Sequence, residues 1–129
     1  MNNTYQELQV YKKAYDIAEI TEVLANSFDI DMKNISAQLL SLSKLLPEKI
    51  AAAESGNFYT LRVEAAFSVR YAAKELQSLL LLCKALQLSH PDYIEFLYDG
   101  LESFRVLFLN WVASFDKRCD YKDDWSFEI

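Results

Sequence analysis

The amino-acid sequence predicts an all-α protein, an antiparallel up-down-up-down four-helix bundle. Apolar residues recur at spacings of three and four along most of the chain, as they do on one face of a helix. The 129 residues include only two glycines and two prolines, whereas sheet proteins need frequent turns. Four amphipathic segments joined by short connections are typical of this bundle. We expect one domain over residues 1–115 and a flexible, acidic tail over residues 116–129.

The first two predicted helices cover residues 5–28 and 31–55. The stripe of the first helix consists of Leu8, Tyr11, Ala14, Tyr15, Ala18, Thr21, Ala25 and Phe28. Asp31 is a suitable N-cap for the second helix, whose stripe consists of Ile35, Leu39, Leu42, Leu46, Ile50 and Ala53. This stripe keeps its phase through Pro47, although an uncompensated interior proline disrupts a helix by ~3 kcal/mol. We therefore predict that Pro47 bends the second helix around the bundle without ending it.

The third predicted helix covers residues 58–86, after a break in which Gly56 suits a C-cap and Asn57 an N-cap. Its expected core face consists of Leu61, Ala65, Ala72, Leu76, Leu79 and Cys83. The helix also carries apolar residues that point away from this face, and a helix that is apolar all round is normally buried all round. We expect an oligomer interface formed by Val63, Phe67, Leu81 and Leu82. Scattered surface apolar residues, which are common, are the alternative.

The fourth predicted helix covers residues 92–115 and follows a break at residues 87–92. In this break Ser89 can act as the cap, and Pro91 suits the first helical turn. The expected stripe consists of Ile94, Leu97, Leu101, Phe104, Phe108, Trp111, Val112 and Phe115. Gly100 is a weak point in this helix, costing ~1 kcal/mol relative to alanine.

The chain offers few groups for catalysis. The single histidine, His90, lies beside Pro91 and is interpreted as part of a turn; it has no Glu-x-x-His pattern of a diiron bundle. No Gly-rich phosphate loop or HExxH motif is present. Cys83 is expected in the core as a free thiol, and Glu75 is expected at the core boundary, solvated or paired with a lysine. We expect no enzyme activity, no catalytic residue, no metal ligand and no cofactor.

The net charge of −6 is concentrated after residue 87. Residues 1–87 hold nine basic and ten acidic residues, whereas residues 88–129 hold four basic and nine acidic ones. The candidate phosphate-binding residues are Lys44, Lys49, Arg62, Arg70, Lys74 and Lys84. Two alternatives remain open for the basic face of the third helix: the rim of a subunit contact, or ion pairing with Glu95, Asp99 and Glu102. The acidic charge argues against nucleic-acid binding.

Nothing in the sequence predicts association with a membrane. No apolar run approaches the ~20 residues that cross a bilayer, and the first residues lack the basic and apolar segments of a signal peptide. Two cysteines do not form a disulfide framework in a domain of this size. We therefore expect a cytoplasmic protein.

Three segments together resemble a bacterial family of small four-helix-bundle proteins. ELQVYKKAYDIA (residues 7–18) is similar to the family's "dL-x-vW-x-x-A" opening. QLLSLSKLLPEKIAAA (residues 38–53) aligns without a gap to "Q-L-R-R-A-A-x-S-I-P-x-N-I-A-E-G". FSVRYAAKELQSLL (residues 67–80) is similar to "F…A-x-S-x-x-E-L". The family includes proteins encoded in intervening sequences of 23S ribosomal RNA genes and the accessory variability determinant of diversity-generating retroelements.

The resemblance implies the bundle fold and a ring-like homo-oligomer, a pentamer in the retroelement proteins. Those relatives are strongly basic and bind nucleic acid and a reverse transcriptase. This chain departs from the family motif at Ser41, Lys49, Ala52 and Ala53, which replace arginine, asparagine, glutamate and glycine. We therefore favour a non-enzymatic, self-associating binding or scaffold protein. The alternative is a nucleic-acid-binding accessory protein that works with a reverse transcriptase.

Overall fold

The computed structural model describes residues 5–56 and 58–118, and these residues form helices and no strand. The four α-helices are α1 (Gln9–Asn26), α2 (Lys33–Gly56), α3 (Tyr59–Ala85) and α4 (Pro91–Ala113). Two short 3₁₀ helices, η1 (Tyr5–Glu7) and η2 (Ile30–Met32), precede α1 and α2. The all-helical class predicted from the sequence is therefore confirmed. None of the described helices is both long enough and apolar enough to span a bilayer.

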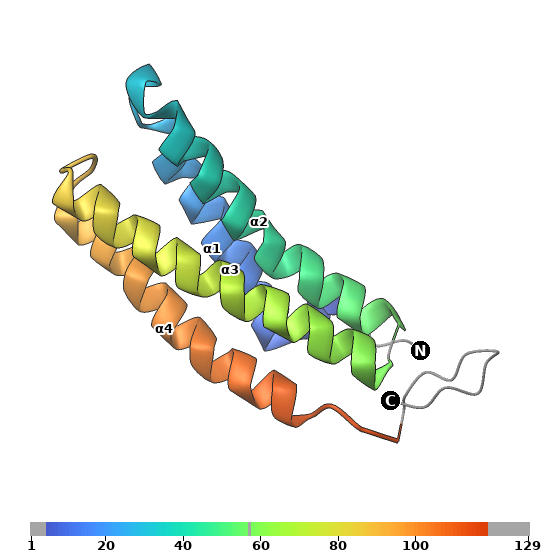
Figure 1. Cartoon of the computed structure of the whole chain (residues 1–129). Helices are drawn as coiled ribbons and strands as arrows, with labels where there is room; N and C mark the ends of the chain where they lie inside the picture. The colour runs from blue at the N-terminus through green and yellow to red at the C-terminus, as the bar shows by residue number, and fades with distance from the viewer. Residues whose placement is uncertain (1–4, 57, 119–129) are drawn as a thin grey trace.

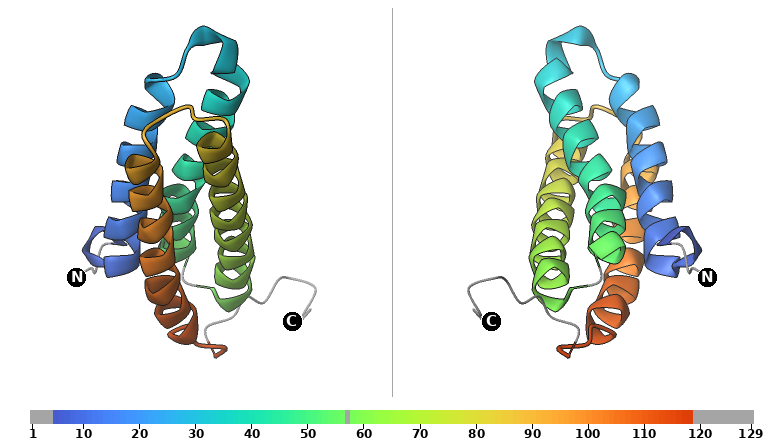
Figure 2. Two further views of the ribbon diagram at one scale, coloured as in Figure 1. Left: turned by 90° about the vertical axis from the view of Figure 1, so that its left-hand side faces the viewer. Right: turned by 90° about the vertical axis from the view of Figure 1, so that its right-hand side faces the viewer.

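The four helices pack side by side as a bundle (Figure 1). The connections from α1 to α2 and from α3 to α4 lie at one end of the bundle, and α2 ends and α3 begins at the other end (Figure 2). α2 packs closely against both α1 and α3, whereas α4 has less extensive contacts with α1 and α3. The side of α3 that faces α4 is therefore only partly filled.

The core contains apolar side chains from all four helices, and these fill the space along the bundle axis. Its largest fully buried members are Ile17, Leu24, Leu39, Leu46, Ile50, Val69, Leu76, Leu80, Ile94, Leu97, Leu101 and Phe104. On α3 the prediction was wrong for Leu61, which is 47% exposed. The buried face is centred about 60° around the helix from Leu61, so that it contacts α4 as well as α2. Val69 and Leu80 occupy this face instead.

α2 continues through Pro47, as the unbroken apolar stripe predicted. Pro47 is buried and has no backbone N–H, so it cannot donate to the carbonyl of Ser43 one turn earlier. The Ser43 hydroxyl is buried too and donates to the Leu40 carbonyl at 3.2 Å. Packing of α2 against α1 and α3 therefore stabilises this helix, although Pro47 by itself would weaken it.

Two of the predicted N-caps are different in the structure. Asp31 lies within η2, and α2 begins two residues later. His90, rather than Ser89, caps α4: its Nδ1 accepts a hydrogen bond from the Asp92 amide at 3.1 Å. The imidazole accepts here because a helix leaves its first amides without partners. The predicted cap Asn57 lies outside the described residues, as does most of the predicted tail.

Candidate functional site

The outward side of α3 carries four exposed apolar side chains. We define the outer α3 face as Phe67, Tyr71, Leu81 and Leu82, which are 62%, 62%, 54% and 43% exposed. At 100° per residue the four side chains lie within about 100° of one another. Three residues of the expected oligomer interface, Phe67, Leu81 and Leu82, thus lie on this face, whereas Val63 is half-buried. Tyr71 is a member that the sequence reasoning missed.

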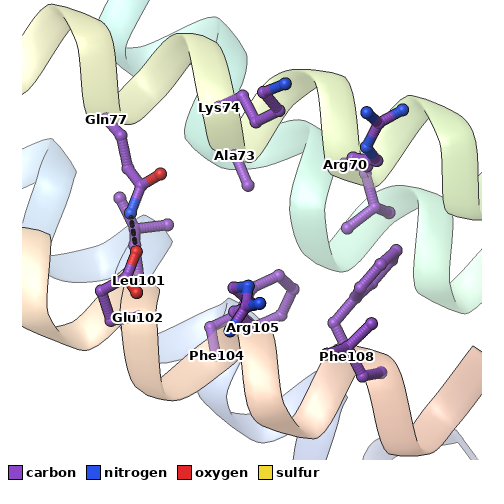
Figure 3. Close-up of a pocket in the computed structure, with 11 residues that line it drawn as sticks. Arg70, Ala73, Lys74, Gln77, Leu101, Glu102, Phe104, Arg105 and Phe108 are labelled. Atoms are coloured by element: carbon purple, nitrogen blue, oxygen red, sulfur yellow. Dashed lines mark hydrogen bonds between the residues drawn. The ribbon is translucent and has the colours of Figure 1, made fainter.

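A second feature is a groove between α3 and α4, with a cavity of about 180 Å³ (Figure 3). We define the α3–α4 groove by its apolar lining and its polar rim. The apolar lining consists of Val69 and Ala73 of α3 and Leu101, Phe104, Phe108 and Leu109 of α4. The rim consists of Arg70, Lys74 and Gln77 of α3 and Glu102 and Arg105 of α4. The groove exists because α4 packs against α3 less closely than α2 does.

The rim of the groove is mainly cationic. Arg70 and Lys74 extend from α3, and Arg105 lies on the opposite side, on α4 (Figure 3). All three side chains are exposed, and none forms an ion pair with a described carboxylate. The one acid of the rim, Glu102, accepts a hydrogen bond from Gln77 Nε2 at 2.7 Å. An apolar lining beneath unpaired cations suits an anionic group that is attached to an apolar one.

Arg105 was missed by the sequence reasoning. Its position between Leu101 and Phe108 shows that it borders the apolar stripe of its helix. Its place opposite Arg70 and Lys74 depends on how far α4 is shifted along α3. The pattern of residues within one helix does not predict how far it is shifted relative to another helix.

The other predicted phosphate-binding residues do not join this rim. Arg62 forms an ion pair with Glu54, and the Lys84 ammonium lies 2.6 Å from the Glu95 carboxylate. The second pair is the helix-to-helix pairing that was one interpretation of the basic and acidic faces. The hydrogen bond from Lys84 is the main reason why the pKa of Glu95 lies below its usual range.

Lys44 and Lys49 lie on α2, away from the groove. Lys44 is exposed and lines a separate hollow between α1 and α2. That hollow also contains the carboxylates of Glu19, Glu22 and Glu48, which makes it a poor phosphate site. Lys49 is half-buried. Of the six basic residues selected from the sequence, the structure gathers Arg70 and Lys74.

A polar cluster joins three helices near one end of the bundle. Glu54 of α2 accepts a hydrogen bond from Trp111 Nε1 of α4 at 2.8 Å and lies 2.7 Å from Arg62 Nη2 of α3. The Arg62 guanidinium lies 5.2 Å from the centre of the Phe115 ring, within cation–π range. Both charged side chains are largely buried, with exposed fractions of 18% for Glu54 and 13% for Arg62. Both carboxylate oxygens of Glu54 have partners within the protein, whereas the buried Nε of Arg62 has no hydrogen-bond partner among the described residues. We interpret the cluster as structural.

The remaining reactive groups are dispersed. Cys83 is fully buried, and this burial raises the pKa of its thiol. His90 is exposed and engaged as a helix cap, and Glu75 is exposed on α3. Among residues 5–56 and 58–118, no three His, Cys, Asp or Glu side chains gather as a metal site would require.

Comparisons of the chain with protein-family models, with curated proteins and with solved structures found no match. The outer α3 face and the α3–α4 groove are the two features on which a functional argument can rest.

Proposed function

We propose that this chain is a non-enzymatic, self-associating scaffold or binding protein, built as an antiparallel up-down-up-down bundle. The positions of the connections at alternate ends of the bundle support this topology (Figure 2). The outer α3 face is the observation that supports self-association. A second copy of the chain would remove this face from water.

Burial of the outer α3 face in an oligomer would contribute favourably to the free energy of association. Burying a Phe or Leu side chain that was exposed contributes about 1.5–3 kcal/mol. The four side chains are between 43% and 62% exposed, so about half of that contribution is still available from each. Several kcal/mol per protomer is enough to offset part of the entropy lost on association.

Light scattering after size-exclusion chromatography tests the proposal. The wild-type protein is expected to form an oligomer at tens of micromolar, and Phe67→Glu and Leu81→Glu are expected to release monomers. Val23→Glu on α1 is the matched control, because Val23 is 63% exposed and lies outside the outer α3 face. Wild-type protein that elutes with the mass of one 14.9 kDa chain would overturn the proposal.

The number of subunits is a separate part of the proposal. The resemblance of residues 7–18, 38–53 and 67–80 to the bundle family supports a ring of five. In such a ring each outer α3 face would contact a different surface of the next protomer, and the contact would close by rotation. A measured mass of five chains agrees with this arrangement, whereas a dimer would indicate a self-complementary contact instead.

A second candidate function is that of a nucleic-acid-binding accessory protein that works with a reverse transcriptase. Arg70, Lys74 and Arg105, which form no ion pair with a described carboxylate, favour it, since phosphates are bound by such groups. A mobility-shift titration at several salt concentrations tests it, because three phosphate contacts lower the affinity steeply as salt rises. Arg70→Glu with Arg105→Glu should abolish binding, and Lys12→Glu on α1 is the control. Absence of binding at low salt would exclude this function.

A further inference from the structure

We infer that the α3–α4 groove is the docking site for the chain's own acidic, aromatic segment, residues 119–129. This inference goes beyond the proposed self-association, which uses the outer α3 face. Three properties of the groove suit this segment: its lining, its charge and its distance from the end of α4.

The lining of the groove suits an aromatic side chain. Phe104 and Phe108 of α4 and Val69 and Ala73 of α3 contribute apolar surface to a cavity of about 180 Å³. The 119–129 segment has the sequence CDYKDDWSFEI, which includes Trp125. Aromatic rings bury a large apolar area and pair well with other rings. Trp125 and Phe127 are two residues apart, and residues at this spacing lie on the same side of an extended chain.

The charge of the groove is complementary to that of the segment. Arg70, Lys74 and Arg105 surround the apolar lining and form no ion pair with a described carboxylate. The segment contains four acids and one lysine, with Asp123 and Asp124 directly before Trp125. An aromatic residue in the cavity would therefore place two carboxylates beside the cationic rim. Charge-assisted hydrogen bonds to arginine are among the strong ones.

The segment is long enough to reach the groove within one chain. α4 ends at Ala113, eight residues after Arg105, which corresponds to about 12 Å along a helix at 1.5 Å per residue. Trp125 is the seventh residue after Arg118, and seven residues span up to about 25 Å when extended. This reach exceeds the helix length between Ala113 and Arg105, so a reversal of the chain after Arg118 would allow Trp125 to approach the groove.

Hydrogen exchange of the full-length protein, followed by mass spectrometry, tests the inference. Amides of residues 119–129 are expected to exchange about tenfold more slowly than in a synthetic peptide of the same sequence, which corresponds to a docked state populated at about nine in ten. Arg70→Glu with Arg105→Glu should remove this protection. Lys12→Glu should leave it unchanged, because Lys12 lies on α1 and outside the groove.

A charge exchange makes the test specific for the proposed contact. Adding Asp123→Arg and Asp124→Arg to the Arg70→Glu, Arg105→Glu variant should restore the protection. If the first variant had lost its protection because the bundle unfolded, the two added substitutions would not restore it. Far-ultraviolet circular dichroism of each variant checks that the bundle is intact. The Phe67→Glu variant should keep the protection, so the inference can succeed or fail independently of self-association.

Three results would overturn the inference. The first is exchange at the rate of the free peptide in the wild-type protein. The second is protection that the charge reversal leaves unchanged, since the rim cations would then have no part in it. The third is protection that increases with protein concentration, which would place the segment in the groove of a second copy.

Discussion

Replacement of Glu54 by alanine tests how the polar cluster joins the end of the bundle. The substitution removes the acceptor of the Trp111 indole N–H and the partner of the Arg62 guanidinium in one step. These groups belong to α4 and α3, whereas Glu54 belongs to α2. Loss of one carboxylate therefore weakens contacts among three helices.

The expected loss of stability follows from the burial of the two partners. Truncating one partner of a buried ion pair costs about 3–5 kcal/mol when the remaining charge is fully buried. Arg62 keeps an exposed fraction of 13%, so water can solvate part of its charge in the variant. We expect Glu54→Ala to lower the free energy of unfolding by about 3 kcal/mol, at the lower end of that range. Glu54→Gln keeps a hydrogen-bond acceptor for Trp111, and we expect it to lower the free energy of unfolding by about half as much as Glu54→Ala does. A neutral hydrogen bond is roughly half as strong as a charged one.

Urea unfolding followed by circular dichroism measures these differences. A shift of the midpoint at constant slope reports a change in stability alone. Glu48→Ala is the control on the same helix, because Glu48 is exposed; its effect should stay within about 0.5 kcal/mol. A loss below about 1 kcal/mol for Glu54→Ala would refute the reasoning, since it would mean that water replaces both contacts at no significant cost.

Combining Glu54→Ala with Arg62→Met separates the ion pair from the indole contact. Methionine retains much of the packing of the arginine stem but removes the charge that Glu54 neutralises. If the unpaired guanidinium causes most of the loss, the double variant should be more stable than the sum of the single effects predicts, by about 1–2 kcal/mol. Additive effects would show that the two charges are not coupled.

Three further predictions concern other positions. Thr21 Oγ1 is buried without a hydrogen-bond partner among the described residues, so Thr21→Val should raise the unfolding free energy by about 1 kcal/mol in urea titrations; a loss would reveal a partner that valine cannot replace. Pro47→Ala should raise the free energy of unfolding by about 1 kcal/mol, because the new backbone N–H can donate to the Ser43 carbonyl and this gain outweighs the loss of buried ring carbons. A destabilised variant would show that packing of the proline ring dominates. Lys84 lowers the pKa of Glu95. The ion pair therefore stabilises the fold at pH values above the unfolded-state pKa of the Glu95 carboxyl. This stabilisation is lost as the pH falls through the lower, folded-state pKa. Carboxyl titration by NMR should show the Glu95 pKa returning toward its ordinary value of 4.5 in Lys84→Met, and an unchanged pKa would contradict the assignment.

Local periodicity in the sequence was sufficient to predict the helices. Spacings of three and four predicted most of the buried residues, though not the exposure of Tyr15 and Leu61, which are both 47% exposed. The pattern continues through Pro47 because burial of the apolar stripe outweighs one missing hydrogen bond. The break near Pro91 was also predicted, since proline suits the first turn of a helix. Such features depend on residues within one or two turns of each other. The choice of His90 over Ser89 as the cap was not predicted, because both residues can accept a hydrogen bond.

The amino-acid sequence by itself determined the helical class, the approximate helix limits and an apolar surplus on α3. Only the tertiary structure decided which residues meet across helices: Arg105 opposite Arg70, and Glu54 beside Trp111. Each of these meetings depends on the rotation and shift of one helix relative to another. Those two quantities result from the packing of all the side chains in the interface, so no pattern within a single helix contains them.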